Sequence, residues 1–148
     1  MEYFDFKDGY GAVPARRHSN GGGWVSDTAK VSETVHVGSD ARVYGYAVVS
    51  GNVRIYDNAK VYGNAVVSGD AKIFGNARIA GSAQVSGFTF IMDNAEIYGD
   101  AVVSGNVLVR DNARICGRVR IEGNELVTNN AFVTNEWYTD KPVYGGRF

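Results

Sequence analysis

One aliphatic residue recurs at every sixth position, without interruption, along about three quarters of the chain. The series begins at Val25 and ends at Val133, and all 19 of its members are Val or Ile. Every Ile of the chain lies in this series, although Val and Ile together make up less than a fifth of the residues. Chance does not produce such a run, so the pattern predicts a repeat architecture built from six-residue units.

The residues between the aliphatic positions explain how each unit folds. A small residue, usually Ala, stands two positions before the aliphatic one, and Gly followed by Asn or Asp often stands after it, as in Val61-Tyr62-Gly63-Asn64-Ala65. Because side chains alternate along a strand, the small and the aliphatic residue point to the same side. Gly, Asn and Asp allow the positive φ of a tight corner. Each unit is therefore one short strand and one corner, and the units must stack to bury their inner side.

The outward residues give the number of units in a coil. Ser50, Ser68 and Ser86 recur every 18 residues, and so do Tyr44 and Tyr62. Three units per coil form a triangular, all-β parallel β-helix of about six coils over residues 24–135. Its interior is filled by Val, Ile and Ala, which leaves no room for a ligand.

The two ends of such a helix need covering, because their strand edges are unpaired. We expect residues 1–23, which are rich in aromatic side chains, to be a cap over the first coil; a partner-binding arm is the alternative. We expect residues 136–148, with Trp137 and Tyr138, to cover the last coil.

Composition narrows the possible functions. The 148 residues carry 15 basic and 16 acidic side chains, so the protein is not a general polyanion binder with a strongly basic surface. The single cysteine, Cys116, excludes an internal disulfide and a thiolate-rich zinc site, and it fits a cytoplasmic protein. The chain has no run of 18 apolar residues, so we expect no membrane span.

An aliphatic residue followed four positions later by a small one, as in Val43…Ala47 and Ile73…Ala77, resembles the hexapeptide-repeat proteins. The resemblance implies a left-handed β-helix and a homotrimer, and the family's best-known activity is acyl transfer from acetyl-CoA. In many acyltransferases the residue after the aliphatic one is Gly or acidic, whereas here it is Tyr, Ser or Phe. In this respect, and in the lead-in over residues 14–25, the chain is similar to uncharacterised bacterial, phage and prophage hexapeptide-repeat proteins.

The enzyme interpretation depends on two histidines. Family acyltransferases use a His as general base near a subunit boundary and carry a loop that covers the cleft. His18 and His36 are the only weak candidates here, and the unbroken repeat leaves no place for such a loop. Two histidines cannot supply the three-His zinc site of the related carbonic anhydrases. We therefore expect no cofactor and no catalytic metal, and we keep an acyltransferase with its site between subunits as the alternative.

Asp57, Asp93 and Asp111 stand at one corner of the expected prism. Asp93 and Asp111 would lie on neighbouring coils, where carboxylates can share a cation. The preferred interpretation is that Asp replaces Gly at a corner because it tolerates the left-handed conformation.

One outer face combines positive charge with tyrosines and is the candidate partner-binding face. Its members are Arg42, Lys60, Arg78, Tyr44, Tyr62 and Tyr98. A basic stripe beside aromatic rings suits an acidic protein surface and, as a weaker expectation, a nucleic acid. The alternative is a solvated ladder of stacked Arg and Tyr side chains.

A second outer face is apolar towards the C-terminal coils. Phe90, Leu108 and Leu126 recur every 18 residues and should form one column. An aligned apolar column at the surface usually marks an interface. We expect this face to hold the subunits of a homotrimer together, with contributions from Phe74, Phe88 and Met92.

These observations favour a non-catalytic protein-binding or scaffold protein. From the resemblance we further expect a phage-encoded protein that binds and inhibits a host factor, such as a component of a defence system. A structural virion component is a further alternative.

Overall fold

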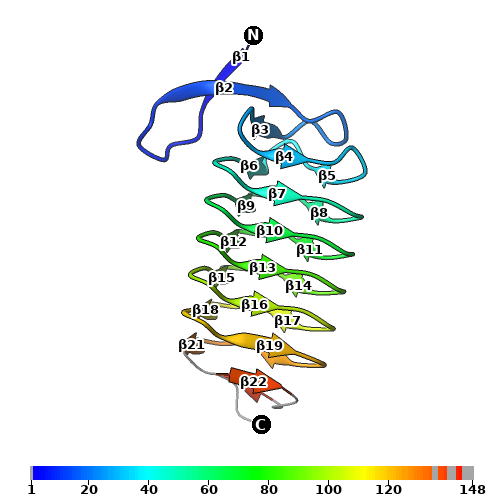
Figure 1. The fold of residues 1–148 in the computed structure, drawn as a ribbon, viewed down its shortest axis with the longest axis vertical. Coiled ribbons are helices and arrows are strands. Elements are labelled where there is room, and N and C mark those ends of the chain that lie inside the picture. The colour runs from blue at the N-terminus through cyan, green and yellow to red at the C-terminus, as the bar shows by residue number, and fades with distance from the viewer. Residues whose placement is uncertain (1, 135–136, 140–142, 145–148) are drawn as a thin grey trace.

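The computed structural model describes residues 2–134, 137–139 and 143–144, with side chains as far as Thr134. All regular elements within these ranges are β-strands, and Figure 1 shows them stacked along one long axis. The strands form three sheets, one on each side of a triangular solenoid. The expected all-β parallel β-helix of about six coils is confirmed.

Each sheet collects every third strand of the solenoid. Sheet A consists of β1 (Glu2–Asp5), β2 (Ala12–Arg17), β3 (Trp24–Ser26), β6 (Arg42–Val43), β9 (Lys60–Val61), β12 (Arg78–Ile79), β15 (Glu96–Ile97), β18 (Arg114–Cys116) and β21 (Phe132–Thr134). Sheet B consists of β4 (Lys30–Val31), β7 (Val48–Val49), β10 (Val66–Val67), β13 (Gln84–Val85), β16 (Val102–Val103), β19 (Arg120–Glu122) and β22 (Trp137–Thr139). Sheet C consists of β5 (His36–Val37), β8 (Arg54–Ile55), β11 (Lys72–Ile73), β14 (Phe90–Ile91), β17 (Leu108–Val109), β20 (Leu126–Val127) and β23 (Val143–Tyr144).

The register places residues 18 positions apart on top of each other. Val43 pairs with Val61, and Ile79 pairs with both Val61 and Ile97, all in parallel strands. In Figure 1 the chain descends from its N-terminal end while it runs from left to right along the near side, through β4, β7 and β10, and returns behind. This sense of rotation is left-handed.

The interior contains the aliphatic series and the small residues that alternate with it. Ile55, Ile73 and Ile79 are fully buried, and so are Ala59 and Ala77. One continuous cluster runs from Val25 to Val133. Since each coil leaves its inner side chains covered only by its neighbours, the stacking itself forms the core.

Two kinds of corner connect the strands. Gly63 has a φ of 68°, and a Cβ atom there would lie 3.0 Å from the backbone nitrogen of Gly81 on the next coil. At the corner between sheets C and A, Asp57, Asp93 and Asp111 adopt positive φ instead. The Oδ2 atom of Asp57 accepts a hydrogen bond from the Gly75 N–H at 3.0 Å. The carboxylate therefore links one coil to the next at a position where glycine would offer only backbone freedom.

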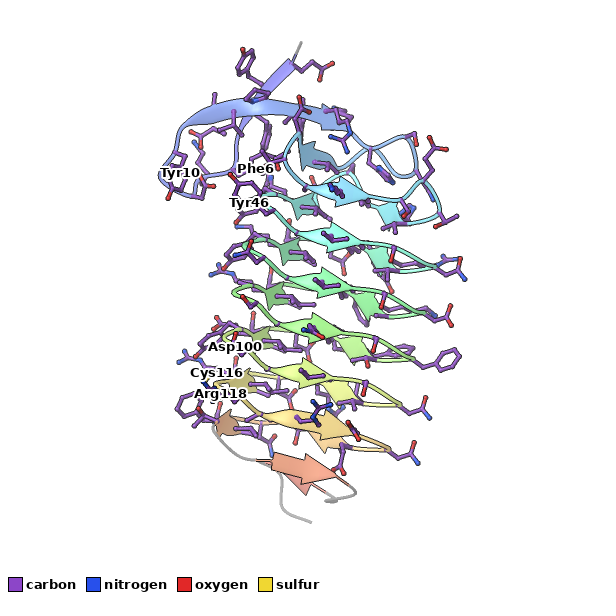
Figure 2. All side chains as sticks on the ribbon, in the orientation of Figure 1. Phe6, Tyr10, Tyr46, Asp100, Cys116 and Arg118 are labelled. Atoms are coloured by element: carbon purple, nitrogen blue, oxygen red, sulfur yellow. The ribbon has the colours of Figure 1, made fainter. Side chains whose placement is uncertain are left out.

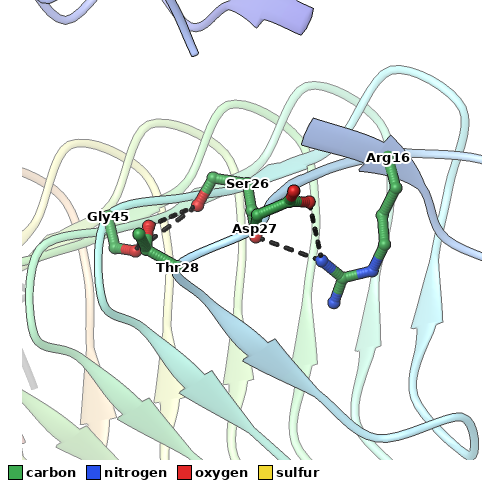
Figure 3. A network of polar contacts seen from close by, with 5 residues as sticks. All are labelled: Arg16, Ser26, Asp27, Thr28 and Gly45. Atoms are coloured by element: carbon green, nitrogen blue, oxygen red, sulfur yellow. Dashed lines mark hydrogen bonds and ion pairs between the residues drawn. The ribbon is translucent and has the colours of Figure 1, made fainter. Parts of the chain in front are cut away.

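The N-terminal segment extends sheet A in the opposite strand direction. β2 pairs antiparallel with β3, and β1 pairs antiparallel with β2. The Arg16 guanidinium donates to the Ser26 carbonyl at 3.3 Å and lies 3.4 Å from the Asp27 carboxylate (Figure 3). The hydroxyl groups of Ser26 and Thr28 contact each other and donate to the Gly45 carbonyl (Figure 3). This network joins the hairpin to the first two coils.

Residues just before β3 cover a second edge of the first coil. The Val37 N–H donates to the Asn20 carbonyl at 2.9 Å, and the Gly23 N–H donates to the Val37 carbonyl at 2.9 Å. The free edge of β5 is thereby paired.

The last strands differ in spacing from the others. β22 pairs with β19 so that Ile121 faces Tyr138, and β23 pairs with β20 so that Val127 faces Tyr144. Both pairs are 17 rather than 18 residues apart, which takes this part of the chain out of the six-residue series. The side chains of Trp137 and Tyr138, expected to cover the last coil, lie outside the described residues.

Among the described residues, no helix has the length and apolar character needed to cross a membrane.

Candidate functional site

The outer face of sheet A carries a vertical stripe of three cations. The strand register places Lys60 between Arg42 above and Arg78 below. None of the ion pairs found among residues 2–134 involves any of these three side chains. Partial burial, followed by the charges of Arg78 and Arg42, lowers the pKa of Lys60. Among residues 2–134, no carboxylate therefore lies within ion-pair distance of the stripe.

A carboxylate ends the stripe on the next coil. Glu96 pairs in register with Arg78 above it and with Arg114 below it. Its Oε1 atom lies 3.9 Å from the Arg114 Nε atom. Glu96 is thus partly neutralised from below, and the uncompensated charge is concentrated over the coils above it.

The three cations are not equally available. The Arg42 guanidinium lies 4.9 Å from the centre of the Phe4 ring, in a cation–π contact with the N-terminal hairpin. Lys60 is half-buried and Arg78 is exposed. The part of the stripe open to a partner is therefore Lys60 and Arg78.

A ladder of aromatic rings runs beside the stripe. The rings of Phe6 and Tyr44 stack at 4.7 Å, and those of Tyr44 and Tyr62 stack at 4.9 Å with only 2° between their planes. Phe6 covers Tyr44, whose side chain is only 6% exposed. Burial, followed by the nearby Tyr62 and Asp8 side chains, raises the pKa of Tyr44 to about 12. Of the three tyrosines expected to meet a partner, Tyr44 is enclosed, and Tyr62 and Tyr98 remain half-exposed.

The ladder is interrupted on the coil after Tyr62. Ala80 occupies the position that Tyr holds at 62 and 98, and a hollow of about 360 Å³ opens there. Tyr62, Tyr98, Arg78 and Glu96 line it together with Ala80. A hydrogen bond to the Cys116 side chain, followed by burial, raises the pKa of Tyr98.

At the N-terminal end of the ladder, the N-terminal loop forms a larger apolar cleft that sequence reasoning did not identify. The cleft measures about 700 Å³ and is lined by Phe6, Tyr10 and Val13 on one side and by Tyr44 and Tyr46 on the other. Tyr10 is 82% exposed and Tyr46 is 67% exposed, and Figure 2 shows both at the corner between sheets A and B. The aromatic residues of the N-terminal segment indicated that it packs on the solenoid, but the sequence did not show which coil they contact.

The two histidines lie at the first coil, away from the stripe. The Nε2 atom of His18, which is 6% exposed, lies 2.8 Å from the Val35 carbonyl oxygen. The Nδ1 atom of His36 lies 3.3 Å from Oδ1 of Asn20. The two contacts thus join the covering segment, which contains His18 and Asn20, to the first coil, and the alternative in which a histidine is a general base stays untested.

Each of the three aspartates at the acidic corner accepts a backbone hydrogen bond from the next coil. Oδ2 of Asp93 accepts from the Asp111 N–H at 3.1 Å, and Oδ2 of Asp111 accepts from the Asn129 N–H at 2.9 Å. Asn76, Asn94 and Asn112 form a parallel ladder of amide hydrogen bonds beside it. Within the described residues, no group of three or more His, Cys, Asp or Glu side chains is arranged to hold a metal ion.

Sheet C carries the apolar column expected to join subunits. Phe90, Leu108 and Leu126 pair directly with one another in register and are half-buried by their stacking. Phe74 stacks on Tyr56 at 5.0 Å, Met92 is half-buried, and Phe88 projects from a corner with 60% of its side chain exposed. The alignment of the column is confirmed, and its role between subunits stays a prediction.

Comparison with known proteins adds one match. A family model described as a YdcK beta solenoid repeat matches residues 53–69 and 71–87. These ranges are two consecutive coils, β8 to β10 and β11 to β13, and they make up less than half of the chain. Among curated proteins, none matches the chain. The comparison and the architecture agree on a repeat β-solenoid.

Proposed function

We propose that the protein is a non-catalytic binding module whose sheet A face holds an acidic surface of a protein partner. The observation that carries the proposal is the stack of Arg42, Lys60 and Arg78, which has no ion-pair partner among residues 2–134. Stacked like charges repel at the strand spacing, and a partner's carboxylates remove that repulsion on binding.

A rigid solenoid also suits such a role. Because the backbone positions are fixed by pairing within the sheet, the spacing of the cations is set before binding and little backbone freedom is lost when a partner binds. The resemblance to phage hexapeptide-repeat proteins extends the proposal to a homotrimer in a phage-infected cell, with a host factor, such as a defence component, as the partner.

The test uses a fluorescein-labelled, glutamate-rich peptide and fluorescence anisotropy at low salt. The double variant Lys60→Glu, Arg78→Glu should weaken binding by tenfold or more, because it reverses the charge of the two accessible cations. The matched control is Arg54→Glu, Lys72→Glu, which changes the equivalent positions of sheet C on the neighbouring strands β8 and β11. Equal loss in both variants, or no binding by the unaltered protein, contradicts the proposal.

A further inference from the structure

The aromatic ladder of sheet A has one unfilled step, and its dimensions are set by the coils. Stacked rings on adjacent coils are 4.9 Å apart at Tyr44 and Tyr62 and 5.0 Å apart at Tyr56 and Phe74. Tyr62 and Tyr98 are two coils apart, which is about 10 Å at the ordinary spacing of paired strands. One planar ring between them would lie about 5 Å from each, within the range that stacked aromatic rings prefer.

The hollow at Ala80 therefore has room for one ring. Its lining includes both signs of charge, since Arg78 and Glu96, which pair in register on adjacent strands, stand beside Ala80. A phosphate chain beside the ring would place its negative charge near Glu96. A tryptophan N–H or a tyrosine O–H, in contrast, can donate to the Glu96 carboxylate while an acidic neighbour meets Arg78.

We propose that the hollow at Ala80 receives one Trp or Tyr side chain of an acidic protein partner, stacked between Tyr62 and Tyr98. This inference rests on the proposed function, because the surrounding cations bring the partner to the face and the hollow selects the residue that enters. Lys60 and Arg78 then attract acidic partners of many sequences. The hollow at Ala80 makes binding specific for a partner with a Trp or Tyr side chain at the matching position.

The test compares two labelled, glutamate-rich peptides that differ only at a central Trp or Leu. The unaltered protein should bind the Trp peptide about tenfold more tightly, which corresponds to about 1.4 kcal/mol. Ala80→Tyr fills the hollow with the ring that its column holds on the neighbouring coils, so it should abolish the preference for the Trp peptide over the Leu peptide. Ser86→Tyr, which adds the same ring to the equivalent position of sheet B, should leave the preference intact, and thermal unfolding checks that both variants fold.

Each result bears on a different part of the proposal. Equal binding of both peptides, or a preference that survives in Ala80→Tyr, overturns the inference while the charge-driven binding stands. Failure of both peptides to bind overturns the proposed function as well. Competition by adenosine 5′-monophosphate that disappears in Ala80→Tyr shows a nucleobase in the hollow and overturns the assignment to a protein side chain.

Discussion

The outer faces of sheets A and C begin with the same arrangement and then diverge. Each carries a stacked aromatic pair with 2° between the ring planes, Tyr44–Tyr62 on sheet A and Tyr56–Phe74 on sheet C. The next position in the column is Ala80 on sheet A, which leaves a hollow, and Met92 on sheet C. The repeat thus sets the positions of the outer side chains, and the size of a single residue, such as Ala80 or Met92, determines whether a column contains a hollow.

The charges on the two faces differ in the same way. On sheet C, the Lys72 Nζ atom lies 5.2 Å from the centre of the Phe90 ring, so an aromatic face stabilises the cation. On sheet A, Lys60 has cations above and below it. A cation in contact with an aromatic ring, as at Lys72, suits an apolar face, whereas a cation between two others, as at Lys60, suits an oppositely charged molecule.

The largest effect is expected at the apolar column of sheet C. Leu108→Lys should reduce the mass in solution from that of a trimer to that of a monomer, because a buried ammonium group in an apolar interface is costly. Light scattering on a sizing column measures the mass. Val102→Lys, at the equivalent position of sheet B, is the control and should leave the mass unchanged. An unchanged mass for Leu108→Lys would show that sheet C does not join subunits.

The second effect concerns the segment that covers sheet A. Phe6→Ala removes a fully buried ring and should destabilise the docked N-terminal loop by about 3 kcal/mol, whereas Tyr10→Ala, at an exposed ring, should have little effect. Faster proteolytic cleavage within residues 6–11 reports the loss of docking.

The same variant tests the cause of the Tyr44 shift. Uncovering Tyr44 should return its pKa from about 12 towards the usual 10.0, as measured by ultraviolet titration. The folded chain holds this proton more tightly than the unfolded chain, so the stabilisation is complete below pH 10 and is lost as the pH rises through about 12. In Phe6→Ala, the free energy of unfolding should therefore fall less between pH 10 and about pH 12 than in the unaltered protein. A Tyr44 pKa that remains near 12 would place the cause elsewhere.

The smallest effects should have opposite signs on the two faces. Lys60→Gln removes repulsion with Arg42 and Arg78 and should raise the free energy of unfolding, while Lys72→Gln removes the contact with Phe90 and should lower it. Each change is about 0.5 kcal/mol. Urea denaturation at low and high salt measures both, and salt should diminish the gain at Lys60. If both variants changed the free energy of unfolding in the same direction, the proposed distinction between the faces of sheets A and C would be wrong.

The solenoid itself was predictable because its determinants are local and repeated. The Val and Ile series fixed the inner face, the 18-residue recurrence fixed three sides, and the register of Phe90 with Leu108 followed directly. The ends were less predictable because they leave the repeat. The pairing of Ile121 with Tyr138 skips one residue, and neither its partner nor its register is encoded by the six-residue series.

The candidate site was predictable in part for the same reason. The column of Arg42, Lys60 and Arg78 follows from spacing alone, and so does the absence of a ring at Ala80. The burial of Tyr44 does not, since it depends on Phe6, which lies outside the repeat and reaches the face through a loop. Long-range docking of an irregular segment leaves no period in the sequence.

The antiparallel hairpin formed by β1 and β2 also affects whether solenoids can stack end to end. A stack of identical coils has no inherent end, and exposed parallel edges invite head-to-tail growth into fibres. Because β2 runs against β3 and β1 runs against β2, sheet A presents a strand of the wrong direction at that end. A second molecule therefore cannot continue all three sheets there. The hairpin therefore blocks continuation of the stack at this end.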